Sequence, residues 1–100
     1  MAQSIILEFK GAGSNEYDQV NKILGIDMAT GAGDWPDGLL NHTGAVSANG
    51  DLVVYEIWES KAVQEKFMAR LGPALHEVGL PEPSRMEWFD VVGQYHTHSH

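Results

Sequence analysis

The side chains best suited to acid–base chemistry lie in two neighbouring segments with the composition of β-strands. Glu56 and Trp58 lie in DLVVYEIWES, residues 51–60. Residues two apart on a strand share a face, so the carboxylate and the indole should lie side by side. A carboxylate held against an apolar surface becomes a stronger base, which suits removal of a phenol or enol proton. Alternatively, Glu56 is a structural group that is hydrogen-bonded across an interface between two copies of the chain.

His42 is the second candidate, and its position depends on the register of a predicted hairpin. Asn49-Gly50 is a strong hairpin signal between two strand-like runs. A two-residue turn would place Asn41 opposite Trp58 and turn His42 to the other side, under a helix. A three-residue loop with a left-handed Gly50 would instead pair His42 with Glu56. Both registers stay open from the sequence, and so does a purely structural role for the histidine.

Two further segments carry groups that can bind ligands. Residues 27–38, DMATGAGDWPDG, form a long loop that either closes Trp35 over an aromatic ligand or packs on its own surface. The last residues, YHTHSH, contain His96, His98 and His100. Alternating imidazoles can hold a metal ion, but a chain end supplies no frame to fix the ligands. We therefore expect adventitious affinity there and no metal site.

The pattern of apolar residues predicts the elements that must position these groups. Residues 4–10 alternate as a strand, and a helix begins at Ser14 or Asn15. The hairpin follows the loop, and a second helix begins at Ser60 and breaks at Gly72-Pro73 before a short turn. Residues 85–92 form a last strand. The order predicts an α+β fold of the ferredoxin-like βαββαβ type, a four-stranded antiparallel sheet with both helices on one face.

Such an arrangement leaves the other face of the sheet without a cover from its own chain. Val54, Trp58, Phe89 and Val91 offer apolar groups that we expect on that face, and we expect Glu56 to point the same way. An apolar sheet face in water predicts association. The expectation is a homodimer that packs sheet against sheet.

Composition excludes several classes of function. The 100 residues carry a formal net charge of -8, with no Lys/Arg stripe, which argues against nucleic acid and anionic membranes as partners. No apolar run is long enough to span a bilayer and no export signal is evident. The absence of cysteine fits a cytoplasmic protein. We expect one domain over residues 1–95 and a histidine-containing tail over residues 96–100.

A strand that ends in YEIWES and leads into a helix at Ser60 resembles the dimeric α+β barrel superfamily, and within it the antibiotic-biosynthesis-monooxygenase-like domains. The resemblance covers residues 3–92 and implies a dimeric barrel with a cavity in each subunit. In haem-degrading relatives the Trp at the position of Trp58 lines that cavity. Their iron-binding His is replaced here by Met68, and their first-strand Asn has no evident counterpart, which argues against haem.

The resemblance implies a cofactor-independent monooxygenase or cyclase that acts on a planar, apolar, aromatic or polyketide-type compound. His42 or Glu56 would take the proton. The candidates for holding the ligand are Trp58, Asn41, Trp35 and Tyr55, with Asn41 at a developing oxyanion. No flavin, nucleotide or metal motif appears, so no cofactor is expected. The alternatives are a binding protein without turnover and a purely structural dimeric barrel.

Overall fold

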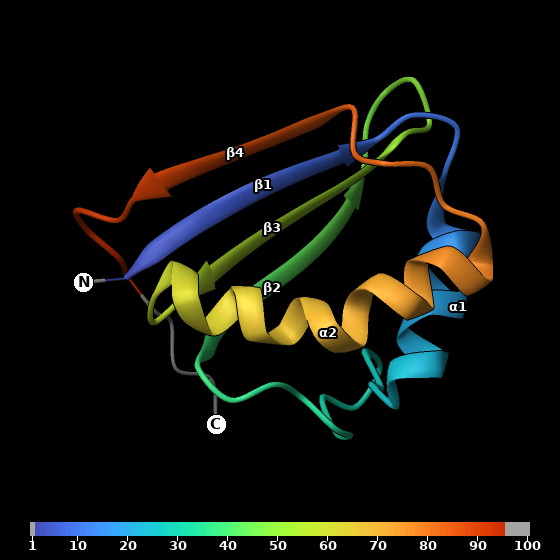
Figure 1. Ribbon diagram of the computed structural model, residues 1–100. Helices are drawn as coiled ribbons and strands as arrows, with labels where there is room; N and C mark the ends of the chain where they lie inside the picture. Colours follow the sequence, from blue (N-terminus) through green and yellow to red (C-terminus); the bar gives the residue numbers. More distant parts are fainter. Residues whose placement is uncertain (1, 96–100) are drawn as a thin grey trace.

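The computed structural model describes residues 2–95, which form one four-stranded sheet and two helices on the same side of it (Figure 1). The elements are β1 (Gln3–Phe9), α1 (Ser14–Leu24), β2 (Leu39–Val46), β3 (Leu52–Trp58), α2 (Lys61–Val78) and β4 (Arg85–Asp90). The strand order is β2-β3-β1-β4, and every neighbouring pair is antiparallel. The predicted ferredoxin-like α+β fold is therefore confirmed.

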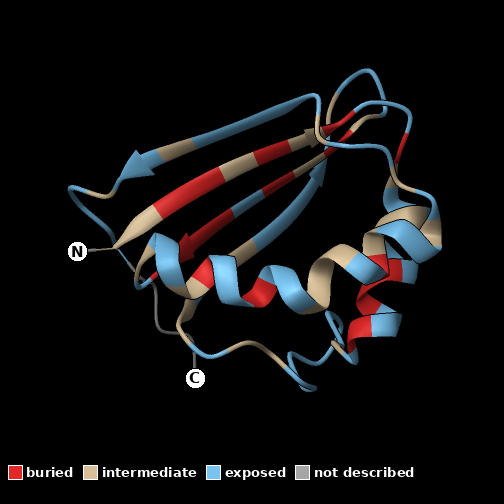
Figure 2. Ribbon diagram, in the orientation of Figure 1, coloured by how far each residue is buried: buried red, intermediate tan, exposed pale blue. Residues whose placement is uncertain are grey.

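The core lies between the sheet and the helices, where Figure 2 shows buried stripes along β1 and β3. Ile5, Leu7 and Phe9 alternate along β1 and are buried against the helices. Phe67 on α2 and Val20 on α1 close the core from the other side. Within the described residues, neither helix has the length and apolar character required to cross a membrane.

The ends of the helices follow the predicted capping residues in part. Ser60 caps α2, and its hydroxyl accepts a hydrogen bond from the Val63 amide at 3.4 Å. The predicted cap of α1 at Ser14 or Asn15 is wrong, because the N-cap is Gly13. The predicted break in α2 is also wrong. The helix runs through Pro73, since packing of its apolar side outweighs the lost backbone hydrogen bond.

The hairpin between β2 and β3 has a three-residue loop. The Ser47 amide donates to the Asp51 carbonyl at 2.8 Å, and Gly50 has φ of 86°, the left-handed conformation that such a loop requires. His42 consequently lies opposite Glu56. The second of the two registers left open by the sequence is the one that the chain adopts.

The faces of β3 are the reverse of those expected. Glu56, Val54 and Trp58 point toward the helices and are buried, since their partners on β1 include the core residues Ile5 and Leu7. The sequence was misleading here because the opposite side of β3 is almost as apolar, so alternation alone did not say which side faces the helices.

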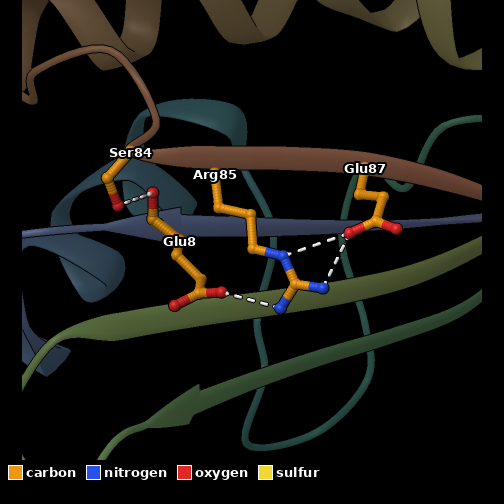
Figure 3. Close-up of polar contacts among 4 residues, drawn as sticks. All are labelled: Glu8, Ser84, Arg85 and Glu87. Carbon is orange, nitrogen blue, oxygen red and sulfur yellow. Dashed lines mark hydrogen bonds and ion pairs between the residues drawn. The ribbon is translucent and has the colours of Figure 1, made fainter.

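The face of the sheet without helices combines apolar and charged side chains. Tyr55 and Phe89 are 38% and 40% exposed. Beside them, Arg85 binds Glu8 at 3.0 Å and Glu87 at 2.7 Å (Figure 3). The hydrogen bond to Glu87, followed by that to Glu8, raises the pKa of Arg85 above its ordinary value. We call the side of the sheet that carries this cluster the open face.

Candidate functional site

A chain of hydrogen bonds joins four side chains on the helix-covered side of the sheet. The indole Nε1 of Trp58 donates to Oε1 of Glu56 at 3.1 Å. Oε2 of Glu56 lies 2.7 Å from Nδ1 of His42. Nε2 of His42 lies 2.5 Å from the hydroxyl of Tyr17. We call Trp58, Glu56, His42 and Tyr17 the polar chain.

The direction of these bonds depends on the tautomer of His42, which the bond to Glu56 selects. An ionised carboxylate only accepts hydrogen bonds, so His42 must carry its proton on Nδ1 to reach Glu56. A neutral imidazole with that tautomer presents Nε2 as an acceptor, and the Tyr17 hydroxyl donates to it. The side chains of His42 and Glu56 are only 12% and 5% exposed. Glu56 therefore orients a shielded base, as the third group does in many catalytic sites.

Tyr17 reaches this chain from α1, because β2 has a glycine beneath the tyrosine ring. A Cβ on Gly44 would lie 2.5 Å from Cζ and 2.8 Å from the hydroxyl oxygen of Tyr17. The Tyr17 and His42 rings stack, with centroids 5.8 Å apart and an interplanar angle of 9°. Burial raises the pKa of Tyr17 above its ordinary value of 10.0, Asn21 opposes the shift, and Glu56 adds to it.

The loop after α1 brings Trp35 to the other side of His42. The two rings meet edge to face, with centroids 5.7 Å apart. The indole Nε1 of Trp35 donates to the Gly31 carbonyl at 3.0 Å. Arg70 on α2 holds the loop by donating to the carbonyls of Leu24 and Asp34 at 3.0 Å each. The loop is thus tied to both helices, and Trp35 forms one wall of the site.

These elements enclose a narrow, mostly apolar cavity. The cavity has a volume of about 50 Å³. The aliphatic and aromatic wall comes from both helices, the sheet and the loop. The polar side chains in the wall are Tyr17, Asn21, His42 and Glu56, along with the Trp35 indole. An apolar pocket with a few convergent polar groups is typical of a small-molecule site.

The structure brings together only some of the predicted site residues. His42, Glu56 and Trp35 line the cavity. Trp58 does not line it: the residue is fully buried behind Glu56 and packs on Phe67, with ring centroids 5.6 Å apart. Asn41 and Tyr55 point to the open face, because they alternate with His42 and Glu56 along their strands.

Sequence reasoning missed Tyr17 and Asn21 as polar groups of the cavity. Tyr17 lies at helical spacing from Val20 and Leu24, so the sequence predicts a packing residue and does not indicate a role for its hydroxyl. Asn21 lies one helical turn after Tyr17, on the same side of the helix as Val20 and Leu24. A polar residue on the apolar side of a helix is the pattern that could have indicated its place in the cavity.

No group of three or more potential metal-binding His, Cys, Asp or Glu side chains occurs in the described part of the chain. The histidines at positions 96, 98 and 100 lie outside the described residues. The polar chain itself contains one histidine and one carboxylate, which suits proton transfer better than metal binding.

The sequence matches no protein-family model and no curated protein. Solved structures do match. A proposed antibiotic biosynthesis monooxygenase from Chloroflexus aurantiacus aligns with a TM-score of 0.69 over 96% of this chain and 98% of its own, at 11% identity. SnoaB, a cofactor-independent oxygenase from Streptomyces nogalater, gives 0.62 over 93% and 94%, at 12% identity. A monooxygenase from the gene ActVA-Orf6 of Streptomyces coelicolor, in complex with nanaomycin D, gives 0.56 over 97% and 91%, at 18% identity.

At these identities the likeness shows the fold, which is that of the antibiotic-biosynthesis-monooxygenase-like proteins. The resemblance drawn from residues 3–92 is confirmed at that level. The activities and the ligand named for these aligned proteins belong to them and are not assigned to this chain by the alignment.

Proposed function

We propose that this chain, which has the fold of the antibiotic-biosynthesis-monooxygenase-like proteins, is a cofactor-independent monooxygenase for a planar, apolar, phenolic compound. The observation that carries the proposal is the position of an oriented base at an apolar cavity: His42 is held by Glu56 on one side and by Tyr17 on the other. The similarity of fold to a cofactor-independent oxygenase supports the same class of reaction.

The proposed reaction oxidises a ring CH₂ group that is activated by a neighbouring carbonyl or phenol. His42 removes one proton of the CH₂, directly or through the Tyr17 hydroxyl, and leaves a carbanion delocalised over the rings. The carbanion reduces molecular oxygen. One oxygen atom becomes the new ring carbonyl, and the other leaves as water with the two hydrogens of the CH₂. Electrons and atoms balance with oxygen as the only co-reactant.

The narrow cavity requires movement before a compound with several rings can bind. Trp35 and Pro36 belong to the cavity wall and lie on a loop. We propose that this segment moves outward to admit the ligand and then covers one face of its ring. The glycines at positions 31, 33 and 38 have positive φ, so substitution there would restrict the loop.

A second candidate, a binding protein without turnover, is favoured by one observation. Both nitrogens of His42 and both oxygens of Glu56 already have partners within the protein. A base whose acceptor site is occupied must exchange its partner before it takes a substrate proton. The two candidates differ in whether Tyr17 passes the proton on or only closes the chain of hydrogen bonds.

The experiment is oxygen uptake with 1,8-dihydroxyanthrone, compared among wild type, His42→Gln and Thr43→Val. Thr43 is the matched control, because it neighbours His42 but points to the open face. The proposal predicts uptake above the buffer rate for wild type and Thr43→Val, and a loss of about 100-fold for His42→Gln. Binding of the anthrone without uptake above the buffer rate would favour the binding protein.

The assembly is also part of the proposal. We propose that the open face is covered by a second copy of the chain, because Tyr55 and Phe89 leave apolar surface there. Analytical ultracentrifugation tests this directly. A monomer at micromolar concentration would contradict it, whereas the cavity is built within one chain and does not depend on the outcome.

A further inference from the structure

Asn21 is the one polar side chain of the cavity wall whose hydrogen bonding is incomplete among the described residues. The residue is 7% exposed, and its Nδ2 is buried without a partner. The other polar groups of the wall all have partners: Tyr17 and Glu56 each bind His42, and Trp35 donates to a backbone carbonyl. A buried donor left unpaired is costly, so its retention calls for an acceptor.

The helix itself does not explain why an asparagine occupies position 21. Asparagine is a poor helix former, and this one lies inside α1 and not at a cap. The amides that close the end of the helix bind the Asn21 backbone carbonyl and not its side chain. The side-chain amide lies close enough to the Tyr17 hydroxyl to lower the pKa of Tyr17, but Nδ2 does not reach hydrogen-bonding geometry with it.

We propose that the Asn21 amide donates a hydrogen bond to an oxygen atom of the bound ligand. This oxygen lies next to the ring CH₂ from which His42 removes a proton, directly or through Tyr17. The inference deepens the proposed function, on which it rests, by specifying the ligand as a planar aromatic ketone or phenol. The terminal torsion of asparagine is soft, so the amide can turn toward a ligand oxygen without a change in the backbone. A donor at that oxygen stabilises the negative charge that grows when the neighbouring CH₂ loses its proton.

The matched probes are 1-indanone and indane, which share a two-ring skeleton and differ by the carbonyl oxygen. Neither needs to be turned over, so the test is independent of oxygenase activity. Titration of the ¹⁵N-labelled full chain is followed by NMR. In wild type, 1-indanone is expected to shift the Asn21 side-chain amide signals, and indane is expected to leave them in place.

Two variants carry the same substitution on the same helix. Asn21→Leu is expected to lower the ratio of 1-indanone to indane affinity about 5-fold, the effect of one lost hydrogen bond. Asn15→Leu, at an exposed position outside the cavity, is expected to leave the ratio unchanged. Because the Asn21 donor is unpaired in the free protein, its replacement by leucine is expected to keep or raise the midpoint of thermal unfolding.

Each outcome decides the inference. An unchanged affinity ratio in Asn21→Leu, or wild-type binding of 1-indanone without a shift of the Asn21 amide signals, would overturn the role of Asn21 and leave the proposed function standing. Failure of wild type to bind 1-indanone would also overturn the role of Asn21, whereas oxygen uptake with 1,8-dihydroxyanthrone decides the proposed function separately. The wild-type amide shift decides the question even where the leucine variant does not fold.

Discussion

The two faces of the sheet hold their charged side chains in different ways. On the side covered by helices, Glu56 is buried with both oxygens bound, to His42 and to Trp58. On the open face, Glu87 of β4 meets Arg85 with half of its side chain in solvent. Removal of one partner of a buried hydrogen bond lowers the free energy of unfolding substantially, whereas an exposed ion pair contributes little to it. The difference indicates that the sheet holds its acid–base groups rigidly on one side only.

The largest effect is expected from removal of the central carboxylate. Glu56→Ala leaves the His42 and Trp58 donors buried and unpaired and opens a gap beside them. We expect the free energy of unfolding to fall by about 3–4 kcal/mol, measured by urea denaturation. A loss below about 1 kcal/mol would contradict the comparison, because the polar chain would then be as loosely held as the open face.

The next effect tests the close approach of Tyr17 to β2. Gly44→Ala places a methyl group into the tyrosine ring and is expected to cost about 2 kcal/mol. It should also displace the hydroxyl from His42, so that a further Tyr17→Phe change costs almost nothing in this background. Gly72→Ala is the control, since nothing lies within 4 Å of its added Cβ and alanine favours a helix. Equal effects of the two alanines would contradict the close approach.

A smaller effect, with a pH signature, is expected from Tyr17→Phe. The loss of one hydrogen bond should cost about 1 kcal/mol at neutral pH. Because the pKa of Tyr17 is raised in the folded protein, its contribution is complete below pH 10.0 and is lost as the pH rises through the folded pKa. The ultraviolet absorbance of phenolate, compared between wild type and Tyr17→Phe, gives that pKa. A Tyr17 that ionises at or below pH 10.0 would contradict the burial of its hydroxyl.

The smallest effect is expected on the open face. Glu87→Gln removes one partner of Arg85, whose other partner is Glu8. We expect a change in unfolding free energy of no more than about 0.5 kcal/mol, and less at high salt. A loss comparable to that of Glu56→Ala would remove the distinction between the two faces.

Much of the fold could be predicted from the sequence, because apolar alternation and the residues Ser60, Gly25 and Gly79 mark its elements. The candidate site was predictable only in part. The hairpin register depends on one loop residue, and two turn types fit Asn49-Gly50 equally well. The face of Glu56 was predicted wrongly because both sides of β3 are apolar. Tyr17 and Asn21 meet the sheet only through tertiary packing, which local patterns do not encode.

The most direct test of the central claim, that His42 removes a ring proton in the cavity, is a deuterium isotope effect. Quinone formation by wild type is measured with 1,8-dihydroxyanthrone that carries CH₂ or CD₂ at the reacting position. We expect enzyme-dependent turnover that is several-fold slower with CD₂ and that falls about 100-fold in His42→Gln. Turnover that persists unchanged in His42→Gln, or no acceleration over buffer by wild type, would contradict it.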